Sequence, residues 1–213
     1  MTTGALFGTR LLEFNLLPSR TLHPSRHAHY GAPAQGVPDD CAPAWHRHWS
    51  RQILQRLGLL DRPVQDAGRP ELALALLPPD KLVRVARYAG AALCGPRLRR
   101  AIAGSEVRQL VSALGADVLD FARHSAAALH PGVAGLEAIE PQAVAGAVDR
   151  LGHATLMAAL HGGGPELALR AELKLPDAPA GDAPCEAPAA LALALDVLKL
   201  TEPTWHSSFP AMR

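Results

Sequence analysis

The sequence has few cysteines, no excess of charge of either sign and no long run of apolar residues. Its cysteines, Cys41, Cys94 and Cys185, are odd in number and far apart, which fits neither a disulfide framework nor a paired zinc knuckle. Lys and Arg total 21 against 20 Asp and Glu, so the net charge gives no reason to expect binding to nucleic acid or to a membrane surface. A reducing cytosol is the expected compartment.

Apolar runs of the length that a signal peptide or a membrane span requires are missing as well. Arg10 and Glu13 interrupt the apolar residues near the N-terminus, so no secretion signal is expected. The Ala-rich segment 126–160 contains several charged side chains, so no window in it approaches the roughly 18 uncharged apolar residues of a membrane span. The sequence predicts a soluble protein that does not insert into the membrane.

What the sequence does contain is enough apolar residues, 48% of 213, for one core, so a single compact domain over 1–213 is expected. Proline and other turn-forming residues cluster at 18–40, 61–70 and 177–188, and these segments are predicted to be irregular. No segment repeats at a fixed period, which argues against a solenoid.

Helical periodicity covers most of the remaining sequence. Trp45, Trp49, Ile53 and Leu57 recur at four-residue spacing and predict a helix between Asp40 and Gly58. Further helices are predicted from Pro79 to Gly95, from Ser105 to about Leu129, from Pro141 to the glycines at 162–164, and between Pro188 and Pro203. In the helix that starts at Pro141, small residues form a stripe suited to close helix packing: Val144, Ala147, Val148, Leu151, Ala154 and Ala158.

One segment has a different period. From Leu167 to Leu175 apolar residues alternate with Ala168, Arg170, Glu172 and Lys174, which predicts a half-buried strand. By composition, 11–16 is the best candidate for a partner strand. The predicted fold class is therefore mainly α, as a single multi-helix domain with a minor β element at 167–175.

The string His161-Gly162-Gly163-Gly164 matches an oxyanion-hole motif of some lipases and esterases. That chemistry also needs a Gly-x-Ser-x-Gly turn, and after Gly104-Ser105 the position of the second glycine is occupied by Val107. The pattern favours the end of a helix followed by a turn, with an esterase as the alternative.

Histidine and cysteine are not spaced for metal or nucleophilic chemistry. Of the histidines that cluster near the N-terminus, His46 and His48 would point to different faces of a helix, and the others lie in a proline-rich segment: His23, His27 and His29. Solvated histidines are favoured over a metal site. Cys94 lies at the apolar end of a helix, where burial raises the pKa of a thiol, so it is expected to be structural. No metal or other cofactor is expected.

The strongest local signal is a basic stretch between positions 81 and 108, where Glu106 is the only acid after Lys81. Its basic residues are Lys81, Arg84, Arg87, Arg97, Arg99, Arg100 and Arg108. The first three recur opposite the apolar stripe and predict a solvent-facing surface. This surface is either simply solvated or docks an acidic protein surface, because such charges steer association. Nucleic acid is less favoured, because Tyr88 is the only aromatic residue among the basic ones.

The segment from Leu72 to Leu129 resembles the central region of the SctK family (YscK, PscK) of type III secretion proteins. It reads LALALLPPDKLVRVARYAGAALCGPRLRRAIAGSEVRQLVSALGADVLDFARHSAAAL: a Leu-rich helix, a glycine followed by a basic Arg-Arg turn, and a long Leu/Val helix. LPSRTLHPS, ALRAELKLP and LDVLKLTEPTWHSSF are similar to the family in order and spacing. The resemblance covers roughly residues 11–209.

This resemblance implies a non-enzymatic adaptor of the cytoplasmic sorting platform, located at the cytoplasmic face of the inner membrane. Family members link the forkhead-associated-like cytoplasmic domain of the ring protein SctD to the pod protein SctQ, and SctL and the secretion ATPase complete the platform. The family supplies no catalytic residues. The basic stretch is then expected to contribute to one of these contacts. An esterase and a nucleic-acid-binding helical protein remain the alternatives.

Overall fold

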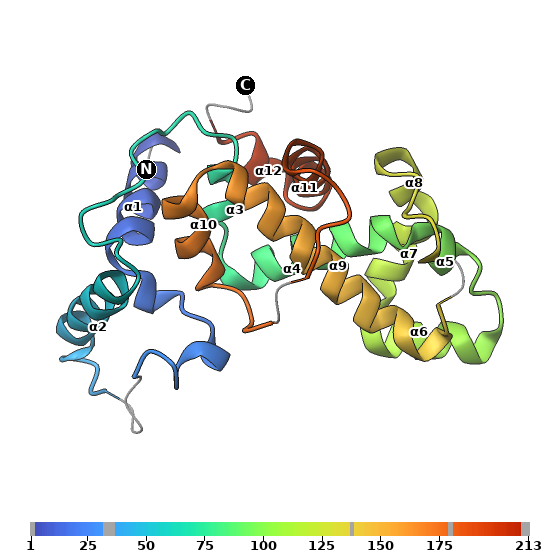
Figure 1. Ribbon diagram of the computed structural model, residues 1–213, viewed down its shortest axis with the longest axis horizontal. Coiled ribbons are helices and arrows are strands. Elements are labelled where there is room, and N and C mark those ends of the chain that lie inside the picture. The colour runs from blue at the N-terminus through green and yellow to red at the C-terminus, as the bar shows by residue number, and fades with distance from the viewer. Residues whose placement is uncertain (1–2, 32–36, 137–138, 179–180, 210–213) are drawn as a thin grey trace. The chain divides into compact units, whose positions relative to one another are not determined.

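The structure, a computed structural model, describes residues 3–31, 37–136, 139–178 and 181–209 (Figure 1). Within these ranges the chain forms the α-helices α1 to α12 and the short 3-10 helices η1 and η2, and it contains no β-strand. The prediction of a mainly α fold is confirmed. No helix in this part of the chain is long and apolar enough to cross a membrane.

The chain divides into two compact units. The first unit comprises Met1–Leu82, Gly163–Pro179 and Thr204–Arg213, and the second comprises Val83–Gly162 and Ala180–Pro203. The first contains α1 (Thr3–Leu16), η1 (Pro18–Arg20), η2 (Pro24–Arg26), α2 (Ala42–Arg56), α3 (Leu72–Ala75), α10 (Pro165–Glu172) and most of α12 (Pro203–His206). The second contains most of α4 (Pro79–Leu93), together with α5 (Gly95–Arg99), α6 (Gly104–Leu114), α7 (Ala116–His124), α8 (Ala126–Leu129), α9 (Pro141–Gly162) and α11 (Ala187–Thr201).

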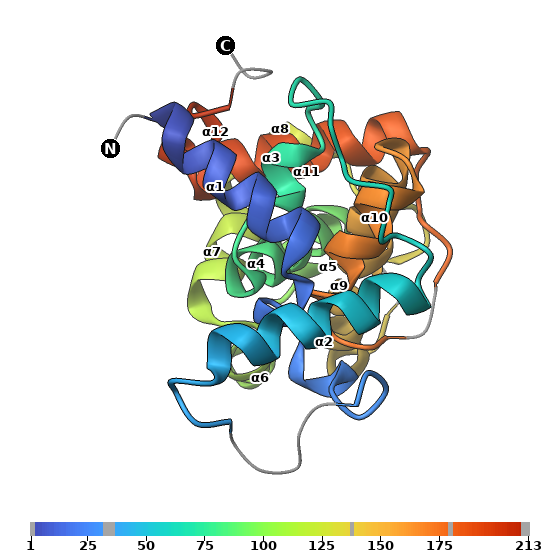
Figure 2. The same cartoon turned by 90° about the vertical axis from the view of Figure 1, so that its left-hand side faces the viewer.

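The core of the first unit includes the face of α2 that the sequence predicted. Trp49 and Ile53 are buried against Leu22 and Leu173, and the indole Nε1 of Trp49 donates a hydrogen bond to the carbonyl of Tyr30 at 2.7 Å. Figure 2 shows α1 and α2 next to one another in this unit. Burying two such large apolar side chains contributes several kcal/mol, at roughly 1.5–3 kcal/mol each.

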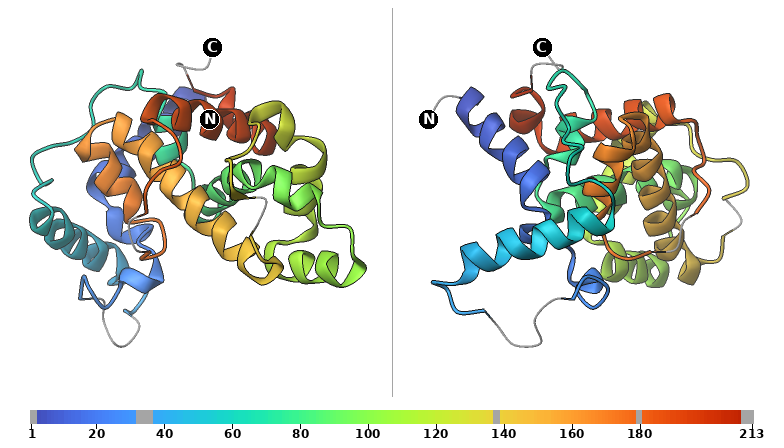
Figure 3. Two further views of the ribbon diagram at one scale, coloured as in Figure 1. Left: turned by 45° about the vertical axis from the view of Figure 1, so that its right-hand side comes forward. Right: turned by 60° about the vertical axis from the view of Figure 1, so that its left-hand side comes forward.

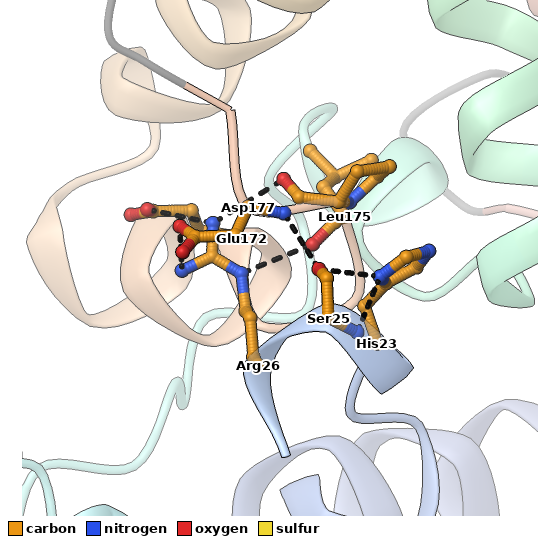
Figure 4. A network of polar contacts seen from close by, with 7 residues as sticks. His23, Ser25, Arg26, Glu172, Leu175 and Asp177 are labelled. Carbon is orange, nitrogen blue, oxygen red and sulfur yellow. Dashed lines mark hydrogen bonds and ion pairs between the residues drawn. The ribbon is translucent and has the colours of Figure 1, made fainter. Parts of the chain in front are cut away.

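The N-terminal segment that follows α1 is fastened to the end of α10 by polar contacts (Figure 4). The buried guanidinium of Arg26 donates from Nε to the carbonyl of Leu175 at 3.0 Å and forms ion pairs with Glu172 at 3.1 Å and Asp177 at 3.6 Å. The hydroxyl of Ser25 accepts a hydrogen bond from the backbone N–H of Asp177 at 2.9 Å. A proline-rich segment without a long helix is thereby held in place by side chains.

The predicted strand at 167–175 is wrong, since these residues form α10 and the turn after it. Gly164, with φ +89°, is the N-cap of α10, and Pro165 then occupies the first turn of this helix, where a missing N–H costs nothing. The segment 11–16, predicted as its partner strand, belongs to α1. Arg170 explains the error: its alternation with leucines indicated an exposed side, yet it is only 2% exposed.

The single helix predicted from Ser105 to Leu129 is also wrong, because the structure has α6, α7 and α8 there. Gly115 separates α6 from α7 with φ +95°, a conformation that disfavours other residues. Ser125, with φ −115°, separates α7 from α8. The apolar pattern continues through both breaks, because one residue between helices hardly disturbs the periodicity. Figure 3 shows α5 to α8 as a group of short helices.

The core of the second unit is formed around α9, beside which α11 runs (Figure 1). The small-residue stripe predicted for α9 is buried at Val144, Ala147 and Val148. On α11, Leu193, Ala194, Val197 and Leu198 are buried in turn. Close packing by small side chains therefore holds this unit together, as the sequence indicated.

Candidate protein-docking surface

The basic residues predicted from the sequence lie on three consecutive helices. Lys81, Arg84 and Arg87 lie on α4, Arg97 and Arg99 on α5, Arg100 directly after α5, and Arg108 on α6. Lys81 belongs to the first unit and the six arginines to the second. The arginines differ in what they contact, and this decides which of them can meet a partner.

Arg97 and Arg99 are tied into the second unit itself. Arg97 is only 8% exposed, and its guanidinium donates to the carbonyl of Ile139 at 2.7 Å and to the carboxylate of Glu106 at 2.6 Å. Arg99 is half-buried and donates to the carbonyl of Ala122 at 3.4 Å. The only acid of the basic stretch after Lys81 is therefore the internal partner of Arg97.

Arg84 and Arg87 lie on the outward side of α4, as predicted, but both have acidic partners. The Nε atom of Arg87 lies 2.9 Å from a carboxylate oxygen of Asp149. Arg84 lies 3.6 Å from Asp117 and stacks on the ring of Tyr88, whose hydroxyl donates to Asp117 at 2.7 Å. This hydrogen bond from Tyr88 lowers the pKa of Asp117, and burial raises the pKa of Tyr88. The two partners of the ion pair, Arg84 and Asp117, are thus both charged at neutral pH.

Arg100 and Arg108 are different, because their side chains are exposed and form no hydrogen bond or ion pair with the residues that the structure describes. Two large apolar side chains on the same segment are also exposed: Ile102 at 85% and Val111 at 36%. We call Arg100, Ile102, Arg108 and Val111 the α5–α6 surface. Arginine combined with apolar side chains is typical of protein interfaces.

Internal contacts fix the backbone of this surface. The ion pair between Arg97 on α5 and Glu106 on α6 joins the two ends of the connecting loop. Within that loop Ala101 is only 1% exposed, and its carbonyl accepts a hydrogen bond from Arg123 at 2.9 Å. Because its neighbour Ala101 is held inside, Ile102 projects outward from a loop that is already ordered. A preformed surface loses less conformational entropy when a partner binds.

The segment that matches the esterase motif forms the junction between two helices. α9 ends at Gly162, as the preferred interpretation predicted, and α10 begins at Pro165. The carbonyl of Gly163 accepts a hydrogen bond from the guanidinium of Arg69, and the ring of His161 lies 2.8 Å from the carbonyl of Met157. These contacts are those of a helix end.

The histidines of the N-terminal region pack against aromatic or hydroxyl side chains. His27 and His46 lie against the ring of Trp49, and His23 and His46 have serine hydroxyls within 2.9 Å. Burial lowers the pKa of His23 and of His46, so both are neutral at physiological pH. His29 and His48 are exposed, as expected of solvated histidines, and His23, His27 and His46 are partly buried. Among the described residues, no three His, Cys, Asp or Glu side chains are grouped as metal ligands.

Cys94, which the sequence placed at the apolar end of a helix, is only 1% exposed. Burial raises the pKa of its thiol to about 11, so the thiolate is not formed at neutral pH. The expectation of a structural cysteine is confirmed for this residue.

The sequence indicated the arginines of the α5–α6 surface but not its apolar residues. Ile102 follows the Arg-Arg pair in a short loop, where no periodicity indicates exposure. The acidic partners Asp117 and Asp149 were missed because they lie outside the basic stretch in the sequence. In the sequence, only their charge, opposite to that of Arg84 and Arg87, could have indicated that they are partners.

Comparison with known proteins places the chain in a family. The family model for YOP proteins translocation protein K (YscK) matches residues 14–205, a range that includes the whole α5–α6 surface. Searches among curated proteins and among solved structures found no match. The resemblance to SctK proteins is confirmed by the family match, which covers far more than half of the 213 residues. The chain belongs to the YscK family of type III secretion proteins.

Proposed function

We propose that the protein is a non-enzymatic adaptor of the type III secretion sorting platform, at the cytoplasmic face of the inner membrane. In this proposal it links the forkhead-associated-like cytoplasmic domain of SctD to SctQ, and reaches SctL and the ATPase indirectly. Membership of the YscK family supports a role in type III secretion. A mainly helical fold that exposes an ordered basic and apolar surface suits a protein that holds others together.

The observation that carries the proposal is the α5–α6 surface, which we assign to one of the two direct partners. Arg100 and Arg108 are the exposed arginines of the stretch that lack an acidic partner among the described residues, so a partner carboxylate would not have to displace an existing ion pair. Ile102 supplies apolar area beside them. The partner surface is therefore expected to be acidic with an apolar centre.

The test is a binding measurement by biolayer interferometry with the purified SctD cytoplasmic domain and purified SctQ. We expect the double variant Arg100→Glu/Arg108→Glu to lose at least tenfold in affinity for one partner and to keep the other, since reversing two charges introduces repulsion against an acidic surface. Ile102→Ser is expected to weaken the same partner without changing any charge. Higher salt should weaken the wild-type contact.

The matched control is Arg47→Glu/Arg51→Glu, which reverses two exposed charges on α2 in the first unit. This variant has the same net charge as the first and should bind both partners normally. Unchanged binding of both partners by the α5–α6 variant would remove the assignment of this surface. Failure of the wild-type chain to bind either partner would overturn the adaptor function itself.

A further inference from the structure

The first unit contains a small pocket that the proposed adaptor function does not use. Its walls come from α1, from η1 and from the turn that precedes α4, and Lys174 reaches it from the turn after α10. The charged residues that line it are Arg10, Glu13, Arg20 and Lys174. Its cavity volume of about 50 Å³ is enough for roughly three to five water molecules, which is also the size of a phosphate group.

Lys174 is a buried cation in the wall of this pocket. Lys174 is only 3% exposed, and its ammonium donates hydrogen bonds to the carbonyls of Ala75, at 2.7 Å, and Leu77. The ring of Phe14 lies 5.6 Å from the ammonium. Burial and the charge of Arg10 lower the pKa of Lys174 to about 7. No carboxylate of the described residues pairs with it, so its charge is compensated by the two carbonyl dipoles and the face of the Phe14 ring.

Arg10 is the second cation and has an unused donor. Its guanidinium stacks on the ring of Trp205 at 5.1 Å. The Nε atom of Arg10 is buried and has no hydrogen-bond partner among the residues that the structure describes. Buried donors of this kind are rare in proteins, because leaving one unpaired costs the energy of its lost hydration.

The charges around the pocket do not balance. Among the described residues that line it, Glu13 is the only acid, and a carboxylate oxygen of Glu13 lies 2.9 Å from the guanidinium of Arg20. Arg10 and Lys174 are then left as two neighbouring positive charges that repel one another, as the lowered pKa of Lys174 also indicates. A bound anion would pair with both cations.

We propose that this pocket is a binding site for a phosphate-sized oxyanion, held between Arg10, Lys174 and Arg20. The anion is either free phosphate or the phosphate group of a small molecule. The site lies entirely in the first unit, whereas the α5–α6 surface lies in the second, so each can be tested without the other.

The experiment is isothermal titration calorimetry of the full chain at pH 6.5 with sodium phosphate and, separately, with phenyl phosphate, against sodium chloride at equal ionic strength. Binding of either phosphate compound above the chloride baseline supports the site. A response to phosphate identifies the free ion as a sufficient ligand, and a response to phenyl phosphate alone identifies an esterified phosphate. Equal heats with chloride and both phosphates overturn the proposal.

Two variants of opposite expected effect keep the test independent of folding. Arg10→Gln should weaken phosphate binding by roughly tenfold or more, because a charged hydrogen bond is lost. Glu13→Gln should strengthen it, since the only acid is removed and Arg20 is released. A variant that is merely misfolded cannot bind more tightly. Unchanged affinity in both variants, measured on samples with wild-type circular dichroism, would overturn the site.

The pH dependence provides the last check. Arg10, Glu13 and Arg20 face the pocket with Lys174, whose lowered pKa of about 7 makes its charge change across this pH range. The affinity should therefore fall as the pH rises from 6.5 to 8.5, although the second ionisation of phosphate by itself would make it rise. In Lys174→Met this fall should disappear. A fall that persists in Lys174→Met would contradict the proposed role of the ammonium.

Discussion

A Cβ atom on Gly90 would lie 1.9 Å from the carbonyl oxygen of Val148, so α4 and α9 touch backbone to backbone in the second unit. The contact is reciprocal, because a Cβ on Gly152 would lie 2.0 Å from the carbonyl oxygen of Ala86. Real Cβ atoms essentially never approach another atom more closely than 3.0 Å. The two helices can cross at this distance only because both positions are glycine.

Gly90→Ala is therefore expected to destabilise the protein strongly. A methyl group at this position meets rigid backbone, so the helices must separate and the core around them must repack. We expect the free energy of unfolding to fall by about 3 kcal/mol or more, at the upper end of what overpacking costs. Urea denaturation followed by circular dichroism measures this change.

Gly146→Ala is the matched control on α9, the other helix of this crossing. Gly146 is exposed, and the only atom close to its added Cβ is the flexible guanidinium of Arg150 at 3.3 Å. Replacing glycine by alanine at an exposed helix position stabilises by about 0.5–1 kcal/mol. If Gly90→Ala had the same small effect as Gly146→Ala, the close crossing of α4 and α9 would be disproved.

This crossing also shows what the sequence can and cannot predict. The small residues of α9 recur at helical spacing, so its narrow face was recognised from the sequence. Gly90 lies inside an apolar helix and could not be matched to Gly152, because which helices cross is decided by tertiary packing. The helices with regular stripes were predicted for the same reason that α9 was.

The strand predicted over 167–175 is wrong because a local pattern does not show which side chains are buried. A leucine pattern over 167–175 agrees with period two, but Gly164 and Pro165 start a helix there, and the basic side chains that indicated a solvent face are buried. Arg170 is accepted inside because its guanidinium donates to three backbone carbonyls within 3.0 Å: Leu59, Arg62 and Glu166. Such burial depends on distant carbonyls, which no local pattern reveals.

Arg97→Ala is expected to lower stability where Arg100→Ala does not. Without Arg97, the carboxylate of Glu106 and the carbonyl of Ile139 lose their donor in a partly buried place, which costs roughly 2–4 kcal/mol. The exposed side chain of Arg100 has no such role, so its removal should change the free energy of unfolding by less than about 0.5 kcal/mol. Thermal or urea unfolding of both variants measures this difference in the free energy of unfolding. Equal stabilities would mean that Arg97 does not hold the α5–α6 loop.

Arg26→Ala is expected to release the segment after α1 from α10. The variant loses the hydrogen bond to Leu175 and the ion pairs with Glu172 and Asp177, so we expect cleavage near residue 30 to become faster in limited proteolysis. Stability should fall by roughly 1.5–3 kcal/mol, because the guanidinium is buried. Arg20→Ala removes an exposed ion pair with Glu13 and should cost less than about 1 kcal/mol. A cleavage rate as slow as that of the wild type would show that other contacts hold the segment.

Lys174 should make the free energy of unfolding rise as the pH rises above 7. Its pKa is lowered to about 7 in the folded chain, from 10.5 in the unfolded chain, mainly by burial. Above pH 7 the unfolded state therefore binds more protons than the folded state, and the free energy of unfolding rises with pH by up to roughly 1.4 kcal/mol per unit. The useful window ends near pH 8.5, below the range where Cys94 titrates.

The measurement is urea denaturation at pH 7.0, 7.75 and 8.5 in a buffer without phosphate, for the wild type and Lys174→Met. The wild type should gain stability across the series, and Lys174→Met should lose this gain because it has no proton to release. Lys199→Met, at an exposed position on α11, should keep it. A rise of equal size in Lys174→Met would assign the pH dependence to another group. A wild-type stability that stays constant would mean that the two carbonyls keep the Lys174 ammonium charged inside the first unit.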